Sequence, residues 1–224
     1  LIALQYHEVK VKLATRAVDS LVNTDGTNAA ATVAPDVNLW VDYIYLDTDE
    51  RRRFAQQSHE YLIEQVQEQS LSSLNQELNF NHPVKELVWT AGSAAAGANQ
   101  YTDLTPVNAT LTATYLLKLN GHDRFAARPA IYFSRVQVND HHSGSGGIDS
   151  NVAGSSKAND AIGVYSFALK PEEHQPSGTC NFSRIDNAKL NFTADPHSGT
   201  MNIYAVNYNV LRIMSGMGGL AYSN

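Results

Sequence analysis

Two adjacent histidines are the residues with the clearest potential for metal chemistry. His141 and His142 follow Asp140 in a segment rich in glycine and serine that also contains Asp149, and imidazole and carboxylate groups are common metal ligands. Adjacent side chains of an extended loop point to opposite sides, however. Metal-binding β-sandwiches place their ligands on strands inside the barrel, with a spacing that is absent here. We therefore predict no metal site and no bound cofactor.

A second candidate is the run His122-Asp123-Arg124, which follows Gly121 and has the residue types of an acid-base pair. Nucleophilic catalysis also requires a serine or cysteine beside such a base, and no motif of that kind accompanies the run. We expect a turn with an ion pair between Asp123 and Arg124. A β-sandwich enzyme would need paired carboxylates or a metal triad in a cavity, and we find neither pattern elsewhere in the sequence. We predict no catalytic residue and no enzyme.

The single cysteine, Cys180, is the third candidate. His174 and His197 suggest a thiol-imidazole pair, but nothing in the sequence indicates that the three residues converge. One cysteine cannot form an internal disulfide, which is typical of a protein made in a reducing compartment. The simpler interpretation is a small buried residue.

Three asparagines begin sequons for N-linked glycosylation, namely Asn108-Ala-Thr, Asn181-Phe-Ser and Asn191-Phe-Thr. Asn181 and Asn191 fall in or beside strand patterns, where an acceptor is poorly accessible. Asn108 lies in a polar loop, residues 92–109. We therefore predict Asn108 as the glycosylation site.

Composition narrows the function classes. The 224 residues include 16 Lys and Arg and 22 Asp and Glu, for a net charge of -6 and a pI near 5.7. Nucleic-acid phosphates are bound by clustered Lys and Arg, so we expect no direct contact with nucleic acid. The run Arg51-Arg-Arg53 stands among acidic residues and is expected to form a solvated helix face. No apolar run approaches the ~20 residues of a membrane-spanning helix, so we predict no transmembrane segment.

The elements that would position these residues are mostly strands. Residues 1–13 and 38–47 have the alternation of two strands without an upstream partner, and Asp47 with Glu50 predicts the start of a helix. Beyond the helix we expect only strands, over residues 61–67, 78–90, 112–120, 130–138, 163–169, 189–193 and 202–213. The loops 92–109 and 139–162 are longer than most loops in compact domains. The pattern predicts an all-β sandwich with jelly-roll connections.

The last strand runs into a glycine-rich tail. Tyr204, Val206, Tyr208 and Val210 alternate with Ala205, Asn207, Asn209 and Leu211, which is the period of a sheet. Gly216, Gly218 and Gly219 follow, and glycine permits backbone angles that are closed to other residues.

Several further motifs follow one another along the chain. They are Leu1-Ile-Ala-Leu-Gln-Tyr-His-Glu-Val9, residues 39–47 (LWVDYIYLD), 53–56 (RFAQ), 59–65 (HEYLIEQ), 78–83 (LNFNHP), 120–126 (NGHDRFA), 165–171 (YSFALKP) and 175–187 (QPSGTCNFSRIDN). Together with the tail they resemble the major capsid proteins of large icosahedral double-stranded DNA viruses. The strongest likeness is to algal viruses of the phycodnavirus type, and iridovirus and asfarvirus capsid proteins are more distant.

The resemblance implies a double jelly-roll fold. Residues 1–47 would be the terminal strands of the first jelly roll, 48–58 a connecting helix, and 59–224 a complete second jelly roll of eight strands. It also implies a structural protein of the virion's outer icosahedral capsid, made and assembled in the host cytoplasm. Three subunits would form a pseudo-hexagonal capsomer that contacts neighbouring capsomers and minor capsid proteins, with glycans on outer loops.

A carbohydrate-binding sandwich is the alternative, because jelly rolls also occur as lectin domains. A lectin would present aromatic side chains on an exposed face or loop. The loop 92–109 has one aromatic residue, Tyr101, and the loop 139–162 has none. The sequence therefore favours the shell protein over the lectin.

Overall fold

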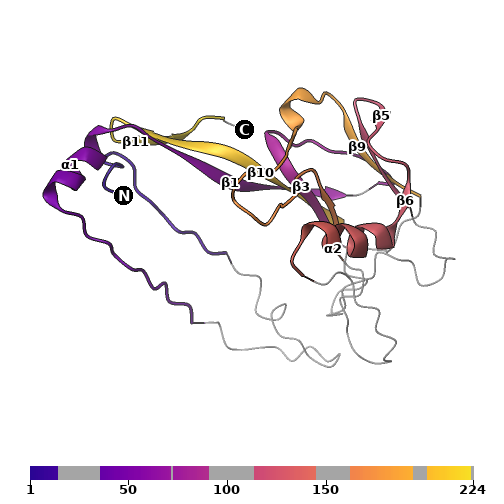
Figure 1. The fold of residues 1–224 in the computed structure, drawn as a ribbon, viewed down its shortest axis with the longest axis horizontal. Coiled ribbons are helices and arrows are strands. Elements are labelled where there is room, and N and C mark those ends of the chain that lie inside the picture. Colours follow the sequence, from indigo (N-terminus) through magenta and orange to yellow (C-terminus); the bar gives the residue numbers. More distant parts are fainter. Residues whose placement is uncertain (15–35, 72, 91–113, 145–161, 194–200, 223–224) are drawn as a thin grey trace. The chain divides into compact units, whose positions relative to one another are not determined.

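The computed structural model describes residues 1–14, 36–71, 73–90, 114–144, 162–193 and 201–222 (Figure 1). The chain forms two units. One contains Leu1–Ile63 with Asn209–Ser223, and the other consists essentially of Glu64–Tyr208. Two long strands, β1 and β10, pass through the boundary between them. The units are described separately.

Two antiparallel sheets account for most of the ordered structure. The first has the order β1-β10-β3-β7, with β8 paired to β3 and β11 paired to β10. The second has the order β2-β9-β4-β5, with β6 paired to β4. The strand bounds are His59–Leu71 (β1), Asn75–Glu77 (β2), Pro83–Thr90 (β3), Thr114–Leu119 (β4), His122–Asp123 (β5), Arg128–Pro129 (β6), Ile162–Ser166 (β7), Cys180–Asn181 (β8), Ala188–Phe192 (β9), Met201–Met214 (β10) and Met217–Leu220 (β11).

The strand order is that of a jelly roll. The chain crosses from one sheet to the other between β1 and β2, β2 and β3, β3 and β4, β6 and β7, β8 and β9, and β9 and β10. Consequently most strands that are neighbours in a sheet are distant in sequence, as Greek-key connections require. The expected all-β sandwich is thus observed, and the strands expected over residues 112–120, 163–169, 189–193 and 202–213 are present within three residues of their predicted bounds.

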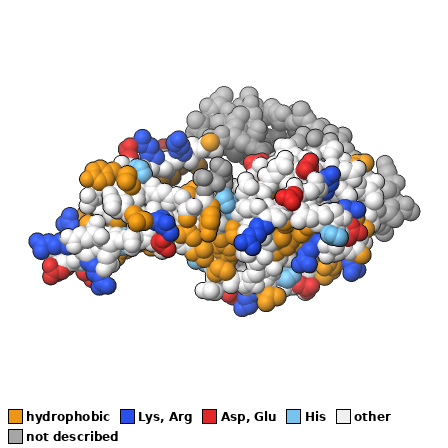
Figure 2. All heavy atoms as spheres, turned by 90° about the horizontal axis from the view of Figure 1, so that it is seen from above, with side chains coloured by type: hydrophobic (Ala, Val, Ile, Leu, Met, Phe, Trp, Pro, Cys, Tyr) orange, Lys and Arg blue, Asp and Glu red, His pale blue; other side chains and the backbone are white. Residues whose placement is uncertain are grey.

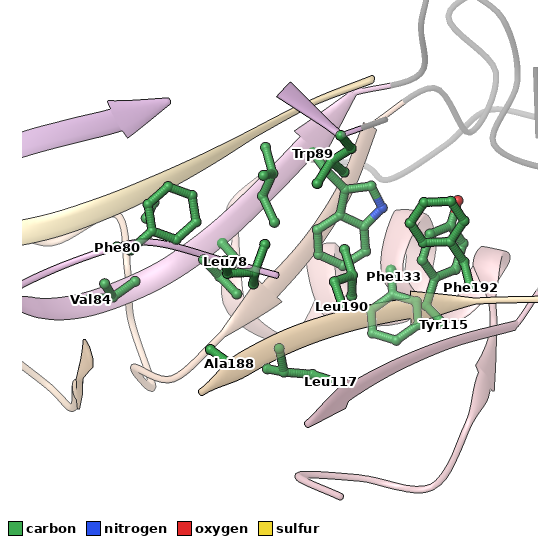
Figure 3. Packing of buried hydrophobic residues seen from close by; sticks show 14 of the residues in the cluster. Leu78, Phe80, Val84, Trp89, Tyr115, Leu117, Phe133, Ala188, Leu190 and Phe192 are labelled. Carbon is green, nitrogen blue, oxygen red and sulfur yellow. The ribbon is translucent and has the colours of Figure 1, made fainter. Parts of the chain in front are cut away.

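Aromatic side chains join the two sheets. The ring of Trp89 on β3 lies 5.6 Å from that of Tyr115 on β4 and 5.2 Å from that of Phe133. Tyr115 in turn lies 5.6 Å from Phe192 on β9, and Figure 3 shows these rings grouped with Leu190 in one cluster. Tilted contacts at such distances are favourable beyond the area they bury. This cluster is the centre of the sandwich.

Gly163 makes room for the largest of these rings. It pairs with Trp89 across β3 and β7, and a Cβ atom at this position would lie 2.4 Å from Cε2 and 2.5 Å from Nε1 of the indole. Directly opposed residues of a sheet project to the same face. The absence of a side chain at 163 therefore lets the indole lie flat on the neighbouring strand.

The strand expected over residues 130–138 is wrong, as is the expectation of no helix beyond the connector. A π-helical turn, Tyr132–Val136, leads directly into α2, Gln137–His141. Its buried residues are Ala130, Phe133, Ser134 and Gln137, a spacing of three, four and seven that is helical. The β-branched residues between them favoured a strand in the sequence, whereas in the structure the helical segment places Phe133 in the core, 5.2 Å from the ring of Trp89.

This helical segment protects the edge of the first sheet. Gln137 accepts a hydrogen bond from the backbone N–H of Ser166 on β7 at 3.2 Å, and its amide donates to the Tyr132 hydroxyl at 2.9 Å. β7 is the last strand in the sheet order. An edge strand covered in this way is less available for unwanted pairing.

The strand expected over residues 78–90 forms only from Pro83 onward, as β3; residues 78–82 are irregular, and the separate short strand β2 precedes them. His82 has a positive φ of 68°, which ends the extended pairing. Side-chain amides replace the missing partner strand. Gln67 exchanges two hydrogen bonds with the backbone of Asn81, at 2.7 and 3.0 Å, and Gln69 binds the carbonyl of Glu77 and the N–H of Asn79.

Two-residue turns close two hairpins. Asn120 and Gly121, between β4 and β5, have φ values of 51° and 82°, and Ser215 and Gly216, between β10 and β11, have values of 51° and 80°. Two consecutive positive φ angles are typical of a type I′ turn. Of the three glycines in the tail, only Gly216 uses the backbone freedom of glycine in this way; Gly218 and Gly219 belong to β11 and have no positive φ.

The other unit contains the helix α1, Thr48–Gln56, which is the connector expected at residues 48–58. Asp47 caps it and accepts a hydrogen bond from the N–H of Thr48 at 2.7 Å. No residue of α1 is buried, so the three arginines lie on a solvated face. The exposure of Arg51, Arg52 and Arg53 agrees with the solvated helix face predicted from the acidic residues around them in the sequence.

The strands expected at residues 1–13 and 38–47 are not formed. The described residues 1–14 and 36–47 contain turns, bends and irregular backbone but no strand. Their apolar side chains are mostly exposed, with Trp40 at 92% and Tyr45 at 90%. A strand requires a neighbouring strand along its length to bond its backbone groups, and no described strand pairs with residues 1–14 or 36–47.

Candidate functional sites

The two histidines of the predicted metal motif have separate partners. His141, the last residue of α2, has its Nδ1 atom 3.1 Å from the carbonyl oxygen of Leu169. His142 follows as the C-cap and faces Glu86 and Glu172 instead. Asp149 lies outside the described residues. Among the residues that the structure describes, no group of three or more His, Cys, Asp or Glu side chains is arranged to hold a metal ion.

The run His122-Asp123-Arg124 forms β5 and the residue after it. The expected ion pair is wrong, because Asp123 Oδ1 lies 3.3 Å from Nζ of Lys118, its cross-strand partner on β4. Arg124 instead lies beside Tyr165 and Cys180, where its charge affects both groups. In an antiparallel pair directly opposed residues project to the same face, whereas successive residues along a strand point to opposite faces. The ion pair of Asp123 therefore joins two strands of the second sheet.

Cys180 lies on β8 and is partly buried against the core cluster. Burial raises the pKa of its thiol, and the positive charge of Arg124 opposes this effect only in part. A raised pKa disfavours the reactive thiolate. His174 does not face this thiol; its Nδ1 atom lies 3.3 Å from Glu64 Oε1. His197 lies outside the described residues.

The predicted glycosylation site, Asn108, lies outside the described residues. Asn181 caps a short 3₁₀ turn, Phe182–Arg184, and accepts a hydrogen bond from the N–H of Ser183 at 3.1 Å. Asn191 lies within β9, with its Oδ1 atom buried. Both asparagines are therefore in or beside regular structure, as expected.

A charged cluster over β3 was not predicted. It consists of Glu64, Lys85, Glu86, His142, Glu172 and His174. Lys85 is only 4% exposed in its side chain, and its Nζ atom lies 2.8 Å from Glu64 Oε1. His142 stands between two carboxylates, with Nε2 3.0 Å from Glu86 and Nδ1 3.2 Å from Glu172. The cluster joins β1, β3, the end of α2 and the loop at residues 172–174.

A β-bulge places Lys85 in this cluster. Along β10, Val206 pairs with Glu86 and the next residue, Asn207, pairs with Val84. Lys85 is thus the extra residue, and its carbonyl accepts hydrogen bonds from the N–H groups of Phe167 and Ala168. A bulge reorients a side chain relative to regular alternation. Two charged residues inside the apolar run 83–89 were the available sequence signal.

The carboxyl groups of the cluster respond to it differently. Partial burial acts to raise the pKa of Glu64, but the hydrogen bonds and positive charges of Lys85 and His174 outweigh it and lower that pKa. For Glu86 burial prevails and raises the pKa, although His142 and Lys85 oppose it. Hydrogen bonds from Ser143 lower the pKa of Glu172. Glu86 and Glu172 therefore make contributions of opposite sign to the pH dependence of stability.

We expect Glu86→Gln to become more favourable relative to the parent protein as pH rises. A raised folded-state pKa contributes stability below the unfolded value, and this stability is lost as pH rises through the folded value. The glutamine side chain cannot ionise, so the variant does not lose this stability as pH rises. Thermal unfolding at about pH 4 and about pH 8 measures the difference.

The control is Glu172→Gln, for which the sign reverses. Its lowered pKa contributes stability above the unfolded value that is lost as pH falls. The amide should therefore be less stable than the parent protein at the higher pH and similar to it at the lower pH. The interpretation fails if the two variants change in the same direction between these pH values.

No described feature resembles an active-site pocket. One open surface cavity, of about 430 Å³, is lined by Ile2, Gln5, Thr48, Arg51, Arg52 and Ala55, without a histidine, cysteine or acid. On the face shown in Figure 2, Lys and Arg side chains are interspersed with Asp and Glu. No helix in the described ranges is both long and apolar enough to cross a membrane.

Comparison with known proteins identifies the family. A family described as "Large eukaryotic DNA virus major capsid protein" matches residues 50–219, and one described as "Major capsid protein N-terminus" matches residues 1–47. The major capsid proteins of Pyramimonas orientalis virus and Paramecium bursaria Chlorella virus 1 are 51% and 42% identical over all of this chain. The chain spans 57% and 62% of their lengths.

A solved structure gives the same result for the fold. The quasi-atomic model of the Paramecium bursaria Chlorella virus 1 capsid aligns with all of this chain and 66% of its own chain, with a TM-score of 0.72 and 39% identity. The predicted fold class, the all-β jelly roll of double jelly-roll capsid proteins, is confirmed, and so is the resemblance on which it was based. The chain belongs to the major capsid protein family of large eukaryotic DNA viruses.

Proposed function

We propose that this chain is part of the structural tile of an icosahedral virion shell. The observation that carries the proposal is the ordered match of residues 1–47 and 50–219 to two regions of major capsid proteins. A shell tile must be stiff, and the aromatic cluster between the two sheets provides a close-packed body. Loops at the ends of the sandwich can then carry contacts without disturbing that body.

The proposed division of the chain follows from its unpaired segments. Residues 1–47 are the terminal strands of a first jelly roll, 48–58 the connector and 59–224 the second jelly roll. Support comes from the exposed apolar side chains of residues 36–47, among them Leu39, Trp40, Ile44 and Tyr45. Such side chains need a partner, and an upstream set of strands would cover them.

The proposed assembly is a homotrimer with a pseudo-hexagonal outline. It would contact neighbouring capsomers and minor capsid proteins and lie in the outer capsid of a virion assembled in the host cytoplasm. Permanent interfaces of this kind bury about 2,000–5,000 Å² or more and are mainly apolar. Glycans on outer loops, including one at Asn108, are compatible with this role.

Neither alternative class gains support. The matched families and relatives are capsid proteins, which favours a structural role over catalysis. The lectin interpretation is less well supported, because the matched families and relatives are described as capsid proteins and not as carbohydrate-binding proteins. The shell role therefore accounts for more of the chain.

Size-exclusion chromatography with light scattering on the full-length protein tests the proposal. We expect a stable trimer at micromolar concentration. A monomer that binds glycans would support the lectin instead, and a monomer without any ligand would contradict the proposed assembly. Intact mass measurement of protein from purified virions tests Asn108 separately.

A further inference from the structure

The glycine-rich end of the chain has a second feature that its turn does not explain. β11 pairs with the end of β10 over Leu211–Met214, and the N-terminal segment Leu1–His7 lies against this hairpin. The N–H of Tyr6 donates to the carbonyl oxygen of Gly216 at 3.0 Å. The N–H of Gly218 donates to Nδ1 of His7 at 2.9 Å. Two hydrogen bonds of different kinds thus join the two ends of the described chain.

The contact requires glycine at two positions, because a side chain at residue 216 or 218 would collide with the N-terminal segment and because Gly216 also has a positive φ. A Cβ atom on Gly218 would lie 2.7 Å from Cδ2 of Leu4, and one on Gly216 would lie 2.8 Å from Cδ2 of Tyr6. Gly219 differs, because nothing lies within 4 Å of its Cβ position. Successive residues of a strand face opposite sides. One face of β11 is therefore covered by the N-terminal segment, and its other face is open at Gly219.

The remaining contacts fix the hairpin in place. Ile213, the partner of Gly218 across the hairpin, is buried, and Ala3 on the N-terminal segment is buried as well. Arg212, on the other side of β10, pairs with Glu60 of β1 at 2.7 Å. The hairpin thus continues the long strand β10, which neighbours β1 in the first sheet, and it is not a free tail.

We propose that the hairpin of residues 211–220 is a docking site for the N-terminal segment Leu1–His7 of the same subunit. Because β10 continues into the jelly roll, the docked segment ties the strands upstream of it to the C-terminal body. This last consequence rests on the proposed function, in which residues 1–47 belong to a first jelly roll. The docking itself depends only on the contacts described above.

Hydrogen exchange on the full-length protein tests the docking. The probe is the amide of Tyr6, which donates to Gly216 and is not itself altered by the substitutions. Gly218→Ala should accelerate exchange at Tyr6 by about tenfold or more, because the new methyl group displaces Leu4. Gly219→Ala, the neighbouring control, should leave it within about twofold. Equal exchange at Tyr6 in both variants would overturn the docking.

A second comparison guards against a general loss of stability. In a Leu4→Ala background the clash partner of Gly218 is gone, so Gly218→Ala should accelerate exchange at Tyr6 by a clearly smaller factor. An undiminished factor would contradict the proposed contact. Protection at Tyr6 that disappears when trimers are diluted to monomers would mean that a neighbouring subunit supplies the segment, which would overturn docking within one chain.

The two proposals can fail separately. A trimer whose Tyr6 exchange is indifferent to Gly218→Ala leaves the shell role intact and rejects the docking site. A protein that does not form trimers but shows the predicted difference between Gly218→Ala and Gly219→Ala retains the docking site and rejects the shell role.

Discussion

Gly163→Ala should lower the free energy of unfolding by about 3 kcal/mol, the upper part of the range for an overpacked core. The new methyl carbon would lie 2.4 Å from Cε2 of Trp89, and the indole is only 1% exposed. The ring cannot move aside easily, because Tyr115 and Phe133 pack against it. For a protein of this size the change corresponds to a fall in Tm of roughly 6–12 °C, which differential scanning calorimetry measures.

The matched control is Gly144→Ala. Nothing lies within 4 Å of a Cβ atom at Gly144, and no positive φ is found there. Its effect should remain within about 0.5 kcal/mol, as for other surface substitutions. Similar losses in the two variants would show that contact with Trp89 is not the cause.

The double variant isolates the contact itself. Trp89→Phe shortens the side chain and removes the five-membered ring with its Nε1 atom. Gly163→Ala should therefore cost at least about 1 kcal/mol less in the Trp89→Phe background than in the parent protein. Additive losses would contradict an argument based on the close approach of these two residues.

Elements with strong local patterns were predictable from the sequence. β9 alternates Ala188, Leu190 and Phe192 inward with polar residues outward, and β10 keeps strand alternation over most of its length. The helix α1 was marked by Asp47 at its start. In each of these cases the local pattern and the final environment agree, as expected for a consistent sequence.

The features that were missed depend on distant parts of the chain. Residues 132–141 became helical because Phe133 reaches the ring of Trp89 in that conformation, and a window of ten residues contains no information about Trp89. The bulge at Lys85 and the charged cluster also depend on contacts between segments that are distant in the sequence. Glu64, Glu86, His142 and Glu172 come from separate elements, and only the completed jelly roll brings them together.

The contact between the N-terminal segment and the β10-β11 hairpin also could not be predicted from the sequence. The sequence indicated that the terminal glycines were unusual, and the expected reason was their backbone angles. Only Gly216 among them has a positive φ, whereas Gly218 has a neighbouring side chain where its own would lie. Composition identifies glycine, but the choice between a turn and a close approach requires the fold.

The chain of residues 1–224 should be poorly soluble when it is expressed by itself, and residues 59–224 alone should be clearly more soluble. Residues 36–47 expose Leu39, Trp40, Tyr43, Ile44 and Tyr45 in a segment that contains no described strand. Contiguous apolar side chains and unpaired backbone groups promote association between chains. We expect the soluble fraction to differ by roughly fivefold or more, measured after expression and by light scattering.

Substitution within the exposed segment separates this cause from chain length. Trp40→Asn combined with Ile44→Asn should restore much of the solubility of residues 1–224, because it removes large apolar surface without shortening the chain. In the full-length protein the same pair should lower Tm, since upstream strands would bury both side chains in the proposed first jelly roll. Equal solubility and equal melting cooperativity of the two chains would count against the division at residues 47–59. The double substitution is thus expected to improve residues 1–224 and to destabilise the full-length protein. Both effects occur together only if Trp40 and Ile44 are exposed in residues 1–224 and buried in the full-length protein.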